Sequence, residues 1–392
     1  MFTKKDIAQI HAQGLSLEQI KAQLRMFNNG VPHITLAKPA TVSDGIQRLN
    51  KTQQEDCIRA FERIKSNKKI YKFVPASGAA SRMFKFLHLF LESDTPPKQL
   101  ETYLSENPEA TLLHTFVKGF TKFPFHKNIE VPKTTDALKT HLKTLLFTKQ
   151  FSELPKALIP FHKMGAHTQT AFEAQLLEAS LYAQNQGEAL LHFTISYTHL
   201  KAFEEALNAC KKRIFKDTGV NFKVQFSFQE PNTDTLAVTP ENMPFRDSTG
   251  ALVFRPAGHG ALLQNLNTIE ADWVFIKNID NVVVDKNLEA VADSKKMLAG
   301  LLLKVQQSAF EFARALEDNE ASEETLHHIA QFLEEHLNVK LPSNYKALSI
   351  QEQQSVLKDR LNRPIRIGGM VKNEGEPGGG PFWIEDSNGN VS

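Results

Sequence analysis

The stretch Ile70-Tyr71-Lys72-Phe73-Val74, followed by Pro75-Ala76-Ser77-Gly78-Ala79-Ala80-Ser81-Arg82, decides the fold expected for this chain. Its first half is rich in β-branched and aromatic residues, which favour a strand. Small residues follow, and apolar side chains that predict a helix begin at Met83. A strand, a small-residue loop and a helix in this order are typical of α/β proteins.

The same alternation continues toward the C-terminus, where apolar runs predict buried strands with helices between them. The expected fold is therefore α/β. It has a Rossmann-like, mixed and mostly parallel sheet of about six or more strands, flanked by helices on both faces. The further expected strands are residues 189–196, 224–228, 252–254 and 273–276, and the helices between them begin at Thr170 and His199.

Three segments are expected along the chain. Residues 1–65 form an N-terminal helical segment, and residues 66–285 form the α/β core with a helical insertion at about 86–155. Residues 286–392 form a helical segment with a glycine-rich β tail. Asn388-Gly389 is a hairpin turn signal, but only Asn390, Val391 and Ser392 follow it. The chain is therefore expected to be a truncated piece of a longer protein.

Composition excludes several functional classes. The formal net charge is +2, with 46 basic and 44 acidic residues, whereas a dedicated nucleic-acid binder needs a strong basic excess. No apolar run reaches the length of a membrane span, and the N-terminus lacks the pattern of a secretory signal. Cys57 and Cys210 provide neither a CxxC motif nor a disulfide framework. We expect a cytoplasmic protein without nucleic-acid or membrane partners, and its oligomeric state stays open.

The loop from Ser77 to Arg82 is the first candidate site. Small residues after a strand let backbone N–H groups approach phosphate oxygens, and the following helix presents its positive N-terminus. Arg82 adds a planar, permanently charged guanidinium that suits phosphate. The structural alternative is a tight turn between strand and helix with a surface arginine. A Walker loop is excluded, because no Gly-Lys-Ser/Thr follows.

The second candidate site is Lys277-Asn278-Ile279-Asp280-Asn281, which directly follows the apolar run at 273–276. Open α/β sheets bind their ligands outside the carboxyl ends of the strands. A carboxylate at that position can hold Mg²⁺ together with waters and substrate phosphates, which makes Asp280 the candidate metal ligand. An ordinary Asn/Asp turn at a strand end is the alternative.

Two glycine-rich stretches complete the set of candidates. In Gly258-His259-Gly260, the two glycines permit the backbone to approach a flat or bulky ligand closely. In residues 368–380, Lys372 is expected to meet a phosphate and Glu376 to accept hydroxyl groups. A flexible surface loop is the alternative for this second stretch.

In their order, these motifs resemble those of the GT-A nucleotidyltransferase superfamily (nucleotide-diphospho-sugar transferases), and most closely its UDP-sugar pyrophosphorylases. The superfamily loop of form GxGTR looks like Gly78–Arg82, with Ala80 at the second glycine. We therefore expect a methyl group where the backbone would approach phosphate. The other similar motifs are a proline-lysine step interrupted by two residues at Pro160–Lys163, strand ends at Thr194-Ile195-Ser196 and Phe228-Gln229, the glycine step at 258–260, and the metal motif Asp280-Asn281.

A closer resemblance spans nearly the whole chain, to a bacterial domain-of-unknown-function family assigned to this superfamily. It is carried by Pro75–Lys85, Gly258–Leu266, Asn278–Val283 and Gly369–Trp383. The superfamily resemblance implies an enzyme that uses Mg²⁺ to join a nucleoside triphosphate, with UTP as first candidate, to a sugar phosphate with release of pyrophosphate. A non-catalytic nucleotide- or sugar-binding protein is the alternative. The implied roles are catalysis by Arg82, Lys163 and Lys372, nucleotide binding by Ser77, Gly78, Ala79, Ser81, Gln229, Gly258, His259 and Gly260, substrate binding by Asn281 and Glu376, and metal binding by Asp280.

Overall fold

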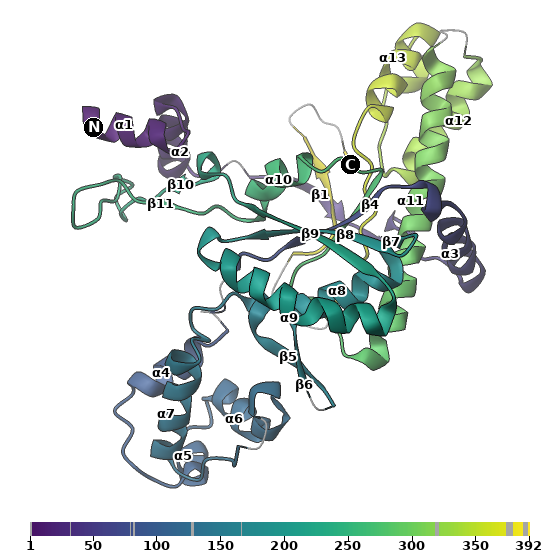
Figure 1. Cartoon of the computed structure of the whole chain (residues 1–392). Helices are drawn as coiled ribbons and strands as arrows, with labels where there is room; N and C mark the ends of the chain where they lie inside the picture. The colour runs from purple at the N-terminus through teal and green to yellow at the C-terminus, as the bar shows by residue number, and fades with distance from the viewer. Residues whose placement is uncertain are drawn as a thin grey trace. The chain divides into compact units, whose positions relative to one another are not determined.

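The computed structural model describes residues 2–31, 33–78, 80, 83–126, 129–165, 167–317, 321–373, 379–386 and 391–392. The chain divides into two compact units, which are described separately. The first unit comprises Met1–Arg25 and Asn67–Glu289, and the second comprises Met26–Ser66 and Ala290–Ser392. Helices and strands alternate in the first unit, so the expected mixed α/β class is confirmed (Figure 1).

A five-stranded sheet forms the centre of the first unit. Strands β12, β4, β8 and β9 are parallel neighbours in this order, and the short β7 pairs antiparallel with the start of β8. The expectation of six or more strands was wrong, because the region near residue 254 pairs elsewhere. The strands are β4 (Ile70–Pro75), β7 (Gln184–Asn185), β8 (Glu188–Ile195), β9 (Asn221–Phe228) and β12 (Trp273–Ile276), and the separate antiparallel pair is β10 (Thr235–Leu236) with β11 (Phe254–Arg255).

Two helices pack on the sheet through aromatic side chains. Helix α8 (Ala171–Tyr182) is capped by Thr170, and α9 (Leu200–Thr218) ends at Gly219, whose positive φ suits glycine. Phe172 of α8 lies 4.8 Å from Phe193 of β8, measured between ring centroids. This burial of apolar rings provides the hydrophobic stabilisation that fixes α8 beside the sheet.

A helical insertion between β4 and α8 has its own hydrophobic core, built largely from Leu and Phe. The expected helical segment at 86–155 therefore does contain helices, and the antiparallel hairpin of β5 and β6 follows it. Its elements are α4 (Lys85–Glu92), α5 (Leu100–Glu106), α6 (Thr111–Lys118), η2 (Phe120–Lys122), η3 (Pro124–His126), α7 (Thr135–Lys143) and the π-helix η4 (Thr144–Thr148), followed by η5 (Lys156–Leu158), β5 (Pro160–Met164) and β6 (His167–Thr170).

Two histidines share a hydrogen bond inside this core. The Nε2 atoms of His126 and His141 lie 2.8 Å apart, and Nδ1 of His126 lies 2.8 Å from the carbonyl oxygen of Phe120. Because Nδ1 must donate to that carbonyl, Nε2 of neutral His126 accepts from His141. Burial lowers the pKa of His126 to about 4, although the hydrogen bond to the carbonyl of Phe120 acts to raise it. Burial also lowers the pKa of His141. Protonating His126 would therefore break this contact.

Acidification is expected to destabilise the insertion. The pKa of His126 falls from 6.5 to about 4 on folding, so the unfolded state binds more protons between these values. Stability should be constant above pH 6.5 and fall by about 3 kcal/mol as pH drops to 4. Hydrogen exchange of residues 111–146 measures this. His126→Asn keeps a donor for Phe120 and cannot titrate, so equal acid sensitivity in variant and wild type would contradict the prediction.

The two N-terminal helices pack against the β10–β11 pair. Ile10 and Ile20 share a buried cluster with Leu236 and Leu252. The buried carboxylate of Asp6 accepts two bonds from Arg246, at 2.7 and 3.0 Å, and this pairing holds the pKa of Asp6 far below its usual range. The helices are α1 (Lys4–Ala12) and α2 (Leu17–Asn29), which runs on into the second unit, and Figure 1 shows them beside β10 and β11.

The second unit joins an early segment to the C-terminal part of the chain. Strand β1 (Thr35–Pro39) pairs antiparallel with β13 (Phe382–Glu385), and Ser392 exchanges two backbone bonds with Ile384. The expectation that residues 1–65 are helical is therefore wrong for 35–46, and Asn388-Gly389 lies outside the described residues. The remaining elements are β2 (Thr41–Val42), β3 (Gly45–Ile46), α3 (Lys51–Ile64), α11 (Leu288–Glu317), α12 (Glu323–His336) and α13 (Ile350–Leu361).

Short helices connect the larger elements of both units. They are η1 (Lys65–Asn67), η6 (Tyr197–His199), η7 (Pro231–Thr233), η8 (His259–Leu262), α10 (Leu263–Asn267), η9 (Asp285–Asn287) and η10 (Tyr345–Ala347). None of the helices formed by the described residues has the length and apolar character needed to cross a membrane.

Candidate functional site

The carboxyl ends of β4 and β12 meet at one edge of the sheet, because these strands are parallel neighbours. Ser77 and Gly78 follow β4 and are exposed, and Lys277–Asn281 follow β12. The strand order reverses here, since β8 and β9 continue from one side of β4 while β12 lies on the other. In open α/β sheets this is where ligands bind. The two leading sequence candidates are thus brought to one edge.

Lys156 is a candidate site residue that the sequence patterns did not single out. Helix η5 begins at Lys156, whose backbone N–H donates to the carbonyl oxygen of Gly78 at 3.1 Å. Its Nζ donates to Oδ2 of Asp280 at 2.7 Å, and the two side chains are 32% and 36% exposed. A cation, a carboxylate and a glycine loop therefore lie together, with both charges reachable from solvent.

A sequence signal for Lys156 was present. The resemblance assigns the proline-lysine step to Pro160–Lys163, where two residues interrupt it, although Pro155-Lys156 is uninterrupted. The structure shows Lys163 on β5, donating from Nζ to the backbone carbonyl of Thr121 in the insertion. Among the described residues, Lys156 is the lysine that contacts Asp280.

The described part of the β4 loop corrects the expected phosphate cradle. The methyl group of Ala80 is fully buried in the core of the insertion, so it does not project where a ligand would approach. The Ala80 N–H donates to the carbonyl oxygen of Leu154 at 3.4 Å, and α4 begins only at Lys85. Backbone donation by Ala80 and an immediate helix N-terminus are therefore not features of this loop. Ala79, Ser81 and Arg82 lie outside the described residues.

The loop that carries Asp280 is a hydrogen-bonded turn. The Asn281 N–H donates to Asn278 at 3.2 Å, and the Val282 N–H donates to the carbonyl oxygen of Asp280 at 3.0 Å. The turn expected as the alternative is thus present, and it presents the Asp280 carboxylate to Lys156. Asn281 is exposed beside it.

Behind this loop lies a buried ionic network. Glu178 of α8 accepts from Lys72 of β4 at 3.1 Å, from Tyr182 at 2.6 Å and from Lys277. Burial raises the pKa of Glu178, but the two ammonium groups lower it more, so the carboxyl stays ionised. Burial and the Glu178 charge raise the pKa of Tyr182 well above 10. Gln175 of α8 completes the network, because its backbone carbonyl oxygen accepts from Nζ of Lys72 at 3.0 Å.

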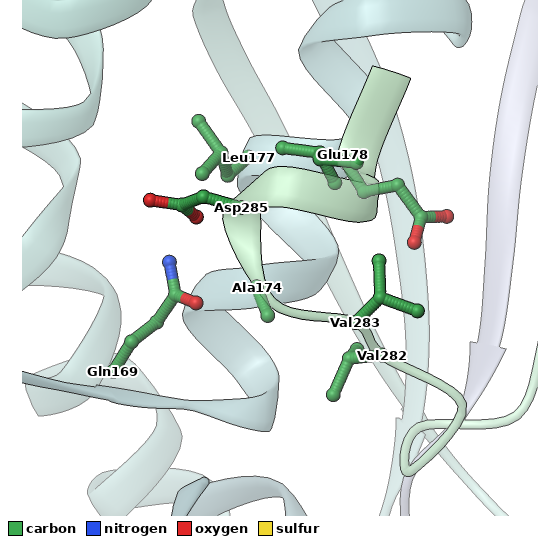
Figure 2. Close-up of a pocket in the computed structure, with 8 residues that line it drawn as sticks. Gln169, Ala174, Leu177, Glu178, Val282, Val283 and Asp285 are labelled. Atoms are coloured by element: carbon green, nitrogen blue, oxygen red, sulfur yellow. The ribbon is translucent and has the colours of Figure 1, made fainter. Parts of the chain in front are cut away.

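A small hollow lies between α8 and the segment after Asp280. Figure 2 shows Val282 and Val283 of this segment beside Ala174 of α8. The hollow is too narrow to admit a water molecule, so it is a packing feature of this loop and not a ligand pocket. Its lining residues are Gln169, Ala174, Leu177, Glu178, Val282, Val283, Asp285 and Leu288.

The remaining candidates of the first unit lie beyond the end of β9. Gln229 is half-buried and donates to Asp234 at 3.1 Å. Gly258-His259-Gly260 is exposed at the start of η8, and a Cβ added to either glycine would meet no atom within 4 Å. The space above these glycines is thus open. Asn265 of α10 ties this region to β9 by donating to the carbonyl oxygen of Phe228 at 2.7 Å.

The donor set for a metal is limited. Across the described ranges, no cluster of three or more His, Cys, Asp or Glu residues could hold a metal ion. Asp280 supplies a single carboxylate, half-exposed, with Oδ2 on Lys156. This set fits Mg²⁺ when substrate phosphates and waters complete its shell, because Mg²⁺ commonly takes only one or two carboxylates. It does not fit a cation held by protein alone.

The last two sequence candidates belong to the second unit. Lys372 is exposed in an extended segment, and Glu376 lies outside the described residues.

Comparison with known proteins identifies a family. A family described as a domain of unknown function (DUF4301) matches residues 3–392, which covers both compact units. No curated protein matches the chain. The family description names neither a ligand nor a reaction, so any activity has to be inferred from the residues of the candidate site.

Proposed function

Since the chain belongs to the family described as a domain of unknown function (DUF4301), we propose its function from the geometry of the site. The protein is a nucleotidyltransferase that joins a nucleoside triphosphate, with UTP as first candidate, to a sugar phosphate and releases pyrophosphate. We infer that its sheet is of the Rossmann-like, nucleotide-diphospho-sugar transferase type. The motif resemblance to UDP-sugar pyrophosphorylases supports this assignment, and the reaction would take place in the cytoplasm.

The contact between Lys156 and Asp280 is the observation that carries the proposal. It lies where β4 and β12 end, at the reversal of strand order that favours ligand binding. Lys156 is also fixed through its backbone to Gly78. A polyphosphate that binds at this edge would contact the ammonium group of Lys156 and the carboxylate of Asp280. The backbone of each residue is already held by hydrogen bonds.

The proposed reaction is an in-line displacement. An oxygen of the sugar phosphate attacks the α-phosphorus of the nucleotide, the bond from that phosphorus to the bridging oxygen breaks, and pyrophosphate leaves with the electron pair. Lys156 stabilises the negative charge that grows on the leaving group. Asp280 orients Lys156 and is the carboxylate that would hold Mg²⁺, which when bound supplies further charge neutralisation. Arg82 and Lys372 remain proposed phosphate contacts on sequence grounds alone.

Replacing Asp280 tests the metal role. The change Asp280→Asn keeps the size of the side chain and removes its charge. Because charge-assisted contacts contribute about 1.5–3 kcal/mol, we expect the Mg²⁺ concentration needed for half-maximal pyrophosphate release to rise about tenfold or more. The measurement is a Mg²⁺ titration of pyrophosphate release with UTP and several sugar 1-phosphates. An unchanged Mg²⁺ requirement would remove Asp280 from the metal site.

A non-catalytic nucleotide- or sugar-binding protein is the second candidate function. The burial of the Ala80 methyl group and the bond from its N–H to Leu154 favour it, because these features remove one backbone donor from the phosphate loop. A thermal-shift screen of the four nucleoside triphosphates with and without Mg²⁺ separates the candidates, since a ligand that binds the folded state raises apparent stability. Stabilisation without pyrophosphate release would support binding alone.

A further inference from the structure

We propose that Gln175 and Glu178, two buried side chains of α8, are positioning residues that hold the Asp280 loop in its working geometry. This inference rests on the proposed function, because it assigns a purpose to the buried network behind the same site. Neither side chain is exposed enough to touch a substrate, with exposed fractions of 0% and 1%. Both act through the backbone and side chains that precede Asp280.

Gln175 holds the loop from inside the protein. Its Nε2 donates to the carbonyl oxygen of Asn278 at 2.9 Å and to that of Ile279 at 3.2 Å. Carbonyl oxygens only accept, so the NH₂ end of the amide must face the loop. The two residues immediately before Asp280 are therefore fixed by one side chain whose orientation has no alternative.

Glu178 fixes the start of the loop to the sheet. Its carboxylate binds Lys277, the first residue after β12, and also Lys72 of the neighbouring strand β4. Lys72 is fully buried, and its Nζ donates to both Glu178 and the backbone carbonyl of Gln175. The carboxylate of Glu178 thus forms two ion pairs, and these join helix α8 to strand β4 and to the end of β12.

The loop is also held after Asp280. Val282 and Val283 line the same narrow hollow as Ala174, Leu177 and Glu178 of α8, as Figure 2 shows, and the Val282 N–H donates to the carbonyl oxygen of Asp280 at 3.0 Å. The backbone is therefore supported on both sides of Asp280, while the Asp280 carboxylate itself stays 36% exposed. This arrangement combines a rigid backbone with an accessible functional group, which is what a preorganised binding site requires.

Stability alone is a weak explanation for such a network. Removing two lysines and a glutamate from water is costly, and apolar side chains of similar volume often stabilise a core as well or better. Buried ionic groups are better justified when they fix one geometry among several. At this site, the geometry they fix is the placement of Asp280 opposite Lys156.

The test is Gln175→Glu, which exchanges one NH₂ for an oxygen. An ionised carboxylate would face two carbonyl oxygens and displace the loop, whereas a protonated one can still donate to one of them. We expect the Mg²⁺ concentration for half-maximal pyrophosphate release to rise about 10- to 100-fold at neutral pH, as for changes next to metal ligands. Lowering the pH should bring the Mg²⁺ requirement of this variant most of the way back to the wild-type value. Compared with wild type at the same pH, hydrogen exchange of residues 277–283 should be faster at neutral pH and should return toward the wild-type rate as the pH is lowered, which gives a readout that needs no turnover.

Two further variants sharpen the test. Gln175→Met removes the donor without adding charge, so it should raise the Mg²⁺ requirement without recovery at lower pH. Gln354→Glu makes the same chemical change at another buried glutamine, which lies on α13 of the second unit. This control should keep the wild-type Mg²⁺ requirement.

The possible outcomes separate the two proposals. If wild-type protein shows no Mg²⁺-dependent nucleotide response, the proposed function fails and this inference fails with it. If wild type responds and Gln175→Glu lowers only the melting temperature, with an unchanged Mg²⁺ requirement and pH profile, the positioning role alone is overturned. A raised Mg²⁺ requirement that recovers at lower pH supports it.

Discussion

Replacing Lys156 with alanine is expected to lower the rate of pyrophosphate release roughly 10²–10³-fold, the usual effect of removing one preorganised donor from a reacting centre. The ammonium of Lys156 is held at 2.7 Å from Asp280 and beside Gly78, so it is positioned before any ligand arrives. Because its contribution grows with the charge on the leaving pyrophosphate, kcat should fall more than KM rises. Steady-state kinetics with saturating Mg²⁺ measure both.

A matched lysine elsewhere on the sheet provides the control. Lys223 of β9 pairs with Glu188 of β8 at 2.8 Å, where both strands begin, and so lies at the edge opposite the candidate site. Lys223→Ala should leave the kinetics unchanged. Both variants should lose little stability, since exposed ion pairs typically contribute about 0–1 kcal/mol. Wild-type turnover by Lys156→Ala would exclude this lysine from the reaction.

Four of the five strands of the sheet, and the place of Asp280 after one of them, could be predicted from local sequence patterns. Trp273–Ile276 is predicted as a strand and forms β12 with these bounds, because four residues rich in aromatic and β-branched side chains are too few for a helix. Its end then delivers Asp280 to the carboxyl edge beside β4. Parallel pairing makes that neighbourhood predictable without knowledge of the helices.

Other features depend on contacts that no local pattern encodes. Strand β1 pairs with β13, more than 300 residues later, so the segment 35–39 looked like part of a helical region. Lys156 carries no motif that singles it out, since only the fold brings it to Asp280. The methyl group of Ala80 is expected where the backbone would approach phosphate, whereas it packs in the insertion core. In each case, tertiary packing decided the role of a residue that sequence alone left open.

Replacing Gly300 with alanine is expected to give the largest loss of stability in the second unit. A Cβ at this position would lie 1.9 Å from the backbone oxygen of Cys57 and 2.5 Å from its carbonyl carbon. Both atoms are backbone, so no side-chain rotation can relieve the clash, and helix α3 would have to move away from α11. Overpacking of this kind costs about 3 kcal/mol, which exceeds the gain of about 1 kcal/mol from alanine's higher helix propensity.

Urea denaturation followed by the fluorescence of Trp383, in a variant whose Trp273 is replaced by phenylalanine, measures this effect. Gly368→Ala is the control, because a Cβ there meets no atom within 4 Å. The control should stay within about 0.5 kcal/mol of its parent, as for surface changes in general. Equal stabilities of the Gly300→Ala and Gly368→Ala variants would mean that α3 and α11 do not approach each other as closely as the structure shows. A large loss for Gly300→Ala alone would instead identify the contact with Cys57 as the point where these two helices fix their spacing.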